Sequence, residues 1–255
     1  MILLNGALVI KKMVKKAVIL TIGNEILSGD VLDENSHWIA KRLFNLGVEL
    51  GFIFVLPDET DIISNYIKEY KEKFDFVITV GGMGPTPDDV TKDAIANAFG
   101  LKLEHNQKVV ELIKSYYQEK VTEQKFLMAI FPEKAEPVFT SDNKWAVGLQ
   151  LDNVFAFPGT PFLVKDAFPG IEHLLKSTPI YKSKININCE ETKFADIMTS
   201  VANDFPDVSI GSYPSNEDFR KVKLIFKSRD KQKIEHCQEE FVNALKKRYS
   251  DLELS

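Results

Sequence analysis

Short apolar stretches alternate with amphipathic stretches along the first two thirds of the chain. Apolar runs occupy positions 17–22, 76–80 and 154–157, and apolar residues alternate over 48–56. Runs rich in Val, Ile and Phe are typical of buried strands. After each stretch, apolar residues recur every three or four positions, which predicts a helix. These repeated units predict an α/β fold, with a mainly parallel open sheet and helices on both faces.

The middle of the chain has a different pattern. Residues 105–131 carry two helical repeats, of which the second begins near Thr122 and ends at Pro132. Residues 135–151 predict extended segments that are joined by a polar turn at 141–144.

The last third of the chain predicts a second, smaller domain. Its apolar pattern gives the order strand, helix, strand, strand, helix, which is typical of a small α+β domain. We therefore expect a loose extension at 1–12, a larger domain at 13–177 and the small α+β domain at 178–255.

The composition is that of an ordinary globular protein. Hydrophobic residues make up 44% of the 255 residues and charged residues 27%, so the chain can bury a sizeable core. The net charge of −5 argues against a nucleic-acid or membrane-surface binder. From position 179 onward, 13 basic residues balance 13 acidic ones and no GxxG loop occurs, so we expect no nucleic-acid partner.

Two further features of the sequence bear on membrane association and on disulfide or zinc binding. Residues 2–10 are apolar but too few to span a membrane, so we expect no membrane association. Cys189 and Cys237 have no CxxC spacing, which indicates neither a disulfide framework nor a zinc site. The sequence therefore predicts a cytoplasmic protein.

Three glycines interrupt the chain where the run at 76–80 ends. Gly81, Gly82 and Gly84 precede a predicted helix, and glycines let the backbone approach a ligand that a Cβ would exclude. If this turn cradles a phosphate, alanine at Gly82 should obstruct the ligand and spare the fold. The alternative interpretation is an ordinary tight turn.

Two carboxylates follow the glycine turn. Asp88 or Asp89 is the predicted N-cap of the next helix. The unpaired N–H groups of a helix start favour an anion, whereas adjacent carboxylates repel one. A phosphate bound there needs a cation between it and the aspartates, and hydrated Mg²⁺ binds in this way.

Polar residues also follow the other predicted strands. Because the carboxyl ends of parallel strands meet at one edge of a sheet, these residues should gather around one ligand. They are Gly23, Asn24 and Glu25 after the first strand, Asp58 after the second, and Gly159, Thr160 and Pro161 after the fourth.

Three motifs resemble one known family. GGMGPTPDDVTKDA resembles the GGxGPTxDDxT signature of the molybdopterin-binding-like family, which includes MoaB and MogA proteins and the amino-terminal domains of CinA and of eukaryotic FAD synthases. GNEILSG and DEN resemble its GxExLxG and DTN segments, with Asn35 matching and Glu34 in place of threonine. NVFAFPGTP resembles NVxxLPGxP. The chain departs from the CinA pattern at NKWAVGLQL and is nearer there to the FAD synthases.

The resemblance implies roles for the motif residues and a KH-like fold for the small domain. Asp89 and Asp58 are the expected catalytic acids, and Asp88 with Asp89 is the expected ligand pair for a divalent metal, Mg²⁺, Mn²⁺ or Co²⁺. The expected substrate-binding residues are Gly23, Asn24, Glu25, Asn35, Gly81, Gly82, Met83, Gly84, Thr86, Thr91, Gly159, Thr160 and Pro161.

Three functions fit such a site. The first is a metal-dependent nucleotide pyrophosphatase that acts on FAD or ADP-ribose, because the resemblance implies this hydrolysis and the strand ends supply anion-binding N–H groups and acids. The second is binding of molybdopterin or its adenylylated form in molybdenum cofactor biosynthesis. The third is a nucleotide-binding regulator without turnover. In each case we expect a small-molecule nucleotide or pterin ligand and a homo-oligomer.

Overall fold

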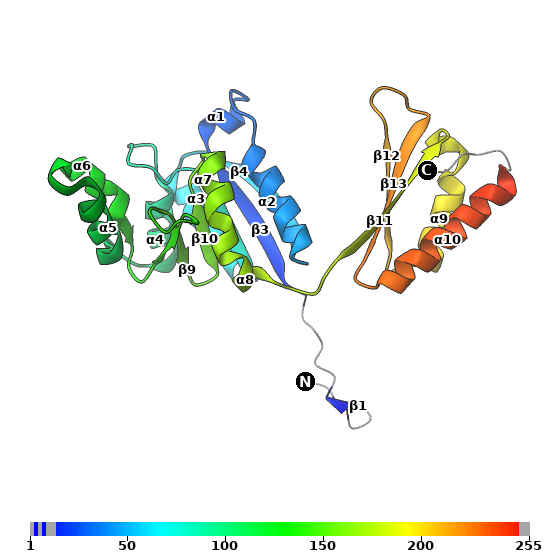
Figure 1. The fold of residues 1–255 in the computed structure, drawn as a ribbon, viewed down its shortest axis with the longest axis horizontal. Helices are drawn as coiled ribbons and strands as arrows, with labels where there is room; N and C mark the ends of the chain where they lie inside the picture. The colour runs from blue at the N-terminus through cyan, green and yellow to red at the C-terminus, as the bar shows by residue number, and fades with distance from the viewer. Residues whose placement is uncertain (1–2, 5–6, 9–13, 250–255) are drawn as a thin grey trace. The chain divides into compact units, whose positions relative to one another are not determined.

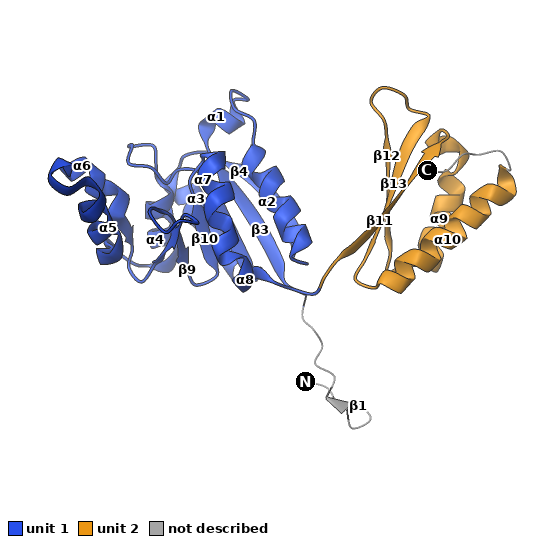
Figure 2. Cartoon of the chain, viewed as in Figure 1, with its two compact units in different colours: residues 1–178 blue, residues 179–255 orange. Residues whose placement is uncertain are grey.

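The chain forms two compact units. The computed structural model describes residues 3–4, 7–8 and 14–249, and the units are residues 1–178 and 179–255 (Figure 2). The extension predicted at 1–12 lies outside the described residues, apart from the short antiparallel pair β1 (Leu3–Leu4) and β2 (Ala7–Leu8).

A six-stranded sheet forms the centre of the first unit (Figure 1). Its strand order is β4-β3-β5-β10-β9-β8. The first four strands in this order are parallel, and β9 and β8 are antiparallel to their neighbours, which confirms the mainly parallel sheet. The strands are β3 (Lys16–Ile22), β4 (Glu49–Leu56), β5 (Phe76–Val80), β8 (Glu136–Phe139), β9 (Ala146–Leu151) and β10 (Val154–Phe157).

Helices cover both faces of this sheet. Alternate residues of β3 point to opposite faces, so Val18 and Leu20 join one apolar cluster, and Ala17 and Ile19 join the other. The first cluster packs against α3 (Thr60–Lys71), α4 (Thr91–Phe99) and α5 (Gln107–Tyr117). The second packs against α2 (Glu34–Asn45), α7 (Pro161–Ala167), η3 (Phe168–Ile171) and α8 (Glu172–Leu175).

The helix predicted from Thr122 to Pro132 is wrong. That segment contains the four-residue helix α6 (Glu123–Phe126), the 3₁₀ turn η2 (Leu127–Ala129) and the strand β7 (Ile130–Pro132). β7 pairs antiparallel with β6 (Leu103–His105). Apolar residues at helical spacing also fit a short turn that enters a strand, because both bury one side of the chain. The remaining short elements are α1 (Asn24–Leu27) and η1 (Gln118–Lys120).

The second unit has the predicted order βαββα. Its antiparallel sheet has the order β11-β13-β12, with strands β11 (Tyr181–Asn188), β12 (Ser209–Pro214) and β13 (Lys221–Ser228). The helices α9 (Ala195–Asp204) and α10 (Lys231–Arg248) lie on one side of this sheet (Figure 2), beside the 3₁₀ turn η4 (Glu191–Lys193). Within the described ranges, no helix of either unit has the length and apolar character needed to cross a bilayer.

We predict that each unit folds alone. The buried residues of the two clusters in the first unit lie between Ala17 and Leu175, and those of the second unit lie between Ile185 and Leu245, so each core is closed within its own unit. Fragments 1–178 and 179–255 should each unfold in one cooperative thermal transition, followed by circular dichroism. An insoluble or non-cooperative fragment would show that the units share a core.

Candidate functional site

The carboxyl ends of β3 and β5 meet at the point where the strand order reverses. The chain goes from β3 to β4 on one side and then returns to β5 on the other, and ligands of open α/β sheets bind at such switch points. A Cβ on Gly81 would lie 2.0 Å from the Ile22 carbonyl oxygen, and Gly81 has a φ of 107°. Only glycine permits this approach, so Gly81 sets the spacing of the two strand ends.

The end of β10 joins the same place. The Gly81 N–H donates to the Phe157 carbonyl at 3.0 Å, and a Cβ on Gly159 would lie 3.7 Å from the Gly81 Cα. The Asn35 Nδ2 donates to the Gly159 carbonyl at 2.6 Å, which ties the start of α2 to this turn. The structure therefore brings Asn35, Gly81 and Gly159 together, although they are far apart in the sequence.

Asn35 also presents an unused acceptor. The residue is 7% exposed, and its Oδ1 is buried without a hydrogen-bond partner in the described structure. A buried polar atom without a partner is costly, typically about 1–3 kcal/mol, and calls for a water or ligand donor. The sequence pointed to Asn35 only through the resemblance, because an amide at a helix start is usually a cap.

Several groups that were expected to bind substrate form hydrogen bonds within the glycine turn instead. The Thr91 N–H donates to the Gly82 carbonyl at 3.0 Å, and the Thr91 hydroxyl donates to the Gly81 carbonyl at 2.9 Å. Thr91 is fully buried, and a Cβ on Gly82 would lie 2.5 Å from its hydroxyl oxygen. The expectation that alanine at Gly82 would spare the fold is therefore wrong, because the methyl group would displace Thr91.

Asp89 holds the turn rather than capping α4. Its Oδ2 accepts the Thr86 N–H at 2.9 Å and also the Thr86 hydroxyl. Burial is the largest single influence on the pKa of this carboxyl, and it acts to raise that pKa. Hydrogen bonds from Thr86 and Gly84, together with the nearby Lys92, outweigh burial and hold the pKa below its ordinary value. The predicted N-cap at Asp88 or Asp89 is wrong, because Val90 is the N-cap and makes no side-chain cap bond.

Asp88 is the exposed acid of the pair. Its carbonyl oxygen accepts the Val90 N–H at 3.0 Å. No group of three or more His, Cys, Asp or Glu side chains among the described residues is placed to hold a metal ion. One or two carboxylates nevertheless suffice for Mg²⁺ when phosphate oxygens and waters complete its shell, so Asp88 and Asp89 fit a cation that arrives with a diphosphate.

The ends of β3 and β4 are tied together beside this turn. The Gly23 N–H donates to the Leu56 carbonyl at 3.1 Å, and the Asn24 N–H donates to the Asp58 Oδ2 at 2.8 Å. The Glu25 carboxylate folds back over Gly23, where a Cβ would lie 2.5 Å from its Oε1. Asp58 thus positions the first strand end through the backbone, and the exposed Glu25 stays at the rim of the site.

The other predicted residues divide between surface and core. Thr160 is the exposed N-cap of α7 without a side-chain cap bond, and Pro161 occupies the first turn of that helix. Met83 packs against the same apolar cluster as Tyr117 and Phe126, so its side chain anchors the loop.

Lys92 is a residue that the sequence reasoning missed. It is 6% exposed, and its Nζ donates to the Leu127 carbonyl at 3.2 Å. The pKa of Lys92 lies below its ordinary value, because burial lowers it by more than the nearby Asp89 and Asp93 raise it. The signal was its position three residues after Asp89 and one helix turn before the apolar residues Ile95 and Ala96.

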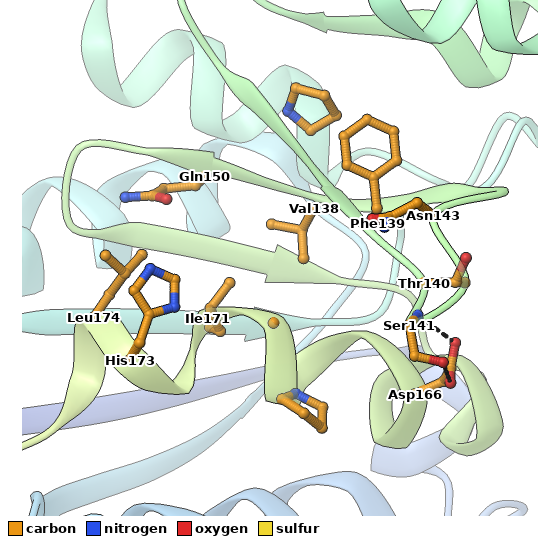
Figure 3. A pocket seen from close by; sticks show the side chains of 13 residues that line it. Val138, Phe139, Thr140, Ser141, Asn143, Gln150, Asp166, Ile171, His173 and Leu174 are labelled. Atoms are coloured by element: carbon orange, nitrogen blue, oxygen red, sulfur yellow. Dashed lines mark hydrogen bonds between the residues drawn. The ribbon is translucent and has the colours of Figure 1, made fainter.

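A hollow lies on the β8 side of the sheet, away from these strand ends (Figure 3). It has a volume of about 490 Å³, and its walls come from β8, from β9 and from the turns after α7. Asp166 is the carboxylate of this hollow, and it already accepts the Ser141 N–H at 3.0 Å and the Ser141 hydroxyl at 2.6 Å. Its charge is thus used to hold the turn after β8, so the strand ends remain the candidate site.

The two units match two protein-family models. Residues 18–176 match the model described as a probable molybdopterin binding domain, and residues 179–252 match the model for the middle domain of FAD synthase. A crystal structure of CinA from Thermoplasma acidophilum is 30% identical, covers 64% of this chain and 99% of its own, and superimposes with a TM-score of 0.58.

Curated relatives show the same relationship. A protein of Archaeoglobus fulgidus is 32% identical over 89% of this chain and 97% of its own length. A CinA-like protein of Thermosipho melanesiensis is 29% identical over 93% of this chain but only 59% of its own, and a probable FAD synthase of Caenorhabditis briggsae is 31% identical over 87% and 48%. The chain thus spans about half the length of these CinA-like and FAD synthase relatives. Because the first family model covers more than half of the chain, the protein belongs to the molybdopterin-binding domain family, and a domain of the FAD synthase middle type follows.

Proposed function

We propose that the first unit is a metal-dependent nucleotide pyrophosphatase. Its substrate would be an adenine dinucleotide-type diphosphate such as FAD or ADP-ribose, and AMP would be a product. The kinship with a probable FAD synthase supports a flavin or adenine nucleotide as the ligand. The observation that carries the proposal is the meeting of the glycine turns of β5 and β10 at the switch point, next to the unpartnered Asn35 Oδ1.

The backbone of the two turns suits an extended anion. Gly159 is exposed, and a Cβ on it would be in van der Waals contact with the Gly81 Cα, so the two turns adjoin and a diphosphate can lie along both without meeting a Cβ. The buried Asn35 Oδ1 accepts a hydrogen bond from a donor, and a ribose hydroxyl of a nucleotide supplies one. These contacts bind and orient the ligand.

Asp88 and Asp89 would hold the cation. A divalent metal there would neutralise the diphosphate and polarise the bond that breaks. Asp89 stays ionised because Thr86 and Gly84 donate to it, and it fixes the turn from which Asp88 projects. Asp58 acts indirectly, because its bond to the Asn24 N–H sets the neighbouring strand end.

A pterin is the second candidate ligand. The matched family is described as a probable molybdopterin binding domain, and molybdopterin also carries a phosphate that the same turns would accept. If the wild-type protein binds neither FAD nor ADP-ribose in a titration with metal, the pterin becomes the favoured ligand.

We predict that Gly159→Ala weakens nucleotide binding and leaves the fold intact. The methyl group would fill the space between the turns of β10 and β5 without a clash. The dissociation constant for ADP-ribose with Mg²⁺, from isothermal titration, should rise about tenfold or more, whereas the free energy of unfolding should stay within about 0.5 kcal/mol.

Gly170→Ala is the matched control for this variant. A Cβ on Gly170 would meet no atom within 4 Å, so alanine fits there too, but Gly170 lies in η3, away from the strand ends. The affinity of the Gly170→Ala protein for ADP-ribose should equal that of the wild type. If a folded Gly159→Ala protein binds ADP-ribose as tightly as the wild type, the diphosphate does not bind against Gly159.

We predict that Asp88→Asn alters the metal dependence of hydrolysis. The Mg²⁺ concentration for half-maximal AMP release should rise about tenfold or more, as when a supporting ligand of a metal is lost. Asp89→Asn should abolish turnover, because the ionised acceptor of the turn is gone. Asp93→Asn, an exposed acid of the same helix, is the control. Wild-type metal dependence in Asp88→Asn would place the cation elsewhere.

We predict an acid-dependent contribution of Asp89 to stability. Its folded-state pKa lies below the ordinary value of 3.8, so its hydrogen bonds contribute fully above pH 3.8 and are lost as the pH falls through the folded value. The melting-temperature difference between wild type and Asp89→Asn should be constant between about pH 7 and pH 5 and shrink below pH 3.8. A difference that does not change down to about pH 2 would contradict this role.

A further inference from the structure

One face of the second unit gathers its strand lysines. β11, β12 and β13 contain five lysines, and the register places all five on the side of the sheet opposite α9 and α10 (Figure 2). The alternate residues, such as Ile185, Leu224 and Phe226, face the helices and form the apolar core. We name this surface the lysine face, and its lysines are Lys182, Lys184, Lys221, Lys223 and Lys227.

The lysine face is positive although the unit is neutral in total. The three strands contain no aspartate or glutamate, and the acids among the described residues of the unit lie in its helices and loops. Lys184 and Lys223 are exposed and take no part in the ion pairs that the described residues of this unit form. Acids flank the strands at their ends, and one of them, Asp218, interacts with Arg220 and Lys221 at the start of β13.

An aromatic ring lies over Gly211 on this face. A Cβ on Gly211 would lie 2.9 Å from the Cε2 and Oη atoms of Tyr213, so the glycine is what lets the ring lie across β12. Tyr213 is 47% exposed, so part of the ring faces solvent. Its cross-strand neighbours are Lys223 on β13 and, beyond it, Asn186 on β11.

A hollow of about 430 Å³ opens beside this ring. Tyr213, Lys221 and Lys223 line it together with the amide side chains of Asn186 and Asn188. An aromatic ring supplies a stacking surface, amides supply donors and acceptors for base edges, and ammonium groups attract phosphates.

We propose that the lysine face binds single-stranded nucleic acid. Bases would stack on Tyr213 and meet Asn186 and Asn188, while Lys184, Lys221 and Lys223 contact the backbone. Lysines two residues apart on a strand are about 6.8 Å apart, a spacing that successive phosphates of an extended strand can follow. Because the total charge of the unit averages over both sides of the sheet, the composition gave no sign of this surface.

The chemistry of the face favours this occupant over two others. An acidic protein surface would pair with the lysines but would gain nothing from an aromatic ring and the amides that line the hollow. A duplex keeps its bases stacked inside, so it could not use Tyr213. Both alternatives are outcomes of the test.

The test is fluorescence anisotropy of the full-length protein with a labelled single-stranded oligonucleotide of about 12 nucleotides. The wild type should bind with a dissociation constant of about 1–100 µM near 50 mM salt. Lys184→Gln/Lys221→Gln/Lys223→Gln should weaken binding at least tenfold and reduce the salt slope by about 2, the value for three phosphate contacts. Tyr213→Ala should weaken binding about tenfold with an unchanged salt slope.

The matched control changes three lysines of α10 on the other side of the sheet. Lys231→Gln/Lys246→Gln/Lys247→Gln removes the same charge and should bind like the wild type. The proposal is overturned if the wild type does not bind, if both triple variants weaken binding equally, or if Tyr213→Ala binds normally. It is also overturned if a duplex or poly-glutamate competes as well as the unlabelled single strand.

Discussion

The close approach of Gly81 to the Ile22 carbonyl is the constraint on which the first unit depends. A Cβ would lie 2.0 Å from that oxygen, so a side chain there would force β5 away from β3. With glycine in place, Gly81 donates to Phe157 and Gly159 reaches Gly81, and three strand ends come together. A buried sheet whose helices cover both faces holds these ends in position, so the site is formed by backbone that the core makes rigid.

The two carboxylates that follow the glycine turn differ in their hydrogen bonding and exposure. Asp89 accepts hydrogen bonds from Thr86 and Gly84, and this favours its ionised form without a metal ion. Asp88, one residue earlier, is exposed to solvent. A cation held by Asp88 and a diphosphate would therefore meet a preformed negative charge on Asp89, and no rearrangement of the loop would be required.

The second unit shows how strand periodicity segregates charge. Lysines at alternate positions of β11 and β13 share one face, while the apolar residues between them form the core against α9 and α10. The balancing acids lie elsewhere in the unit, so a neutral total hides a positive surface. Gly211 adds to this surface, because a side chain there would lift the ring of Tyr213 from the sheet.

The sequence by itself determined the fold class, the order βαββα of the second unit and the loops of the candidate site, because period-two and period-3.6 patterns and glycine clusters are local signals. Local signals failed between Thr122 and Pro132, where a short turn and a strand bury the same residues that a helix would. Only the tertiary structure decided which polar groups remain available to a ligand. Thr91 looks like a site residue in the motif, but its hydroxyl donates to Gly81 within the turn, whereas the Asn35 Oδ1 has no hydrogen-bond partner among the described residues. The physical reason is that hydrogen-bond satisfaction depends on atoms that are brought together from distant parts of the chain, and no spacing in the sequence records it.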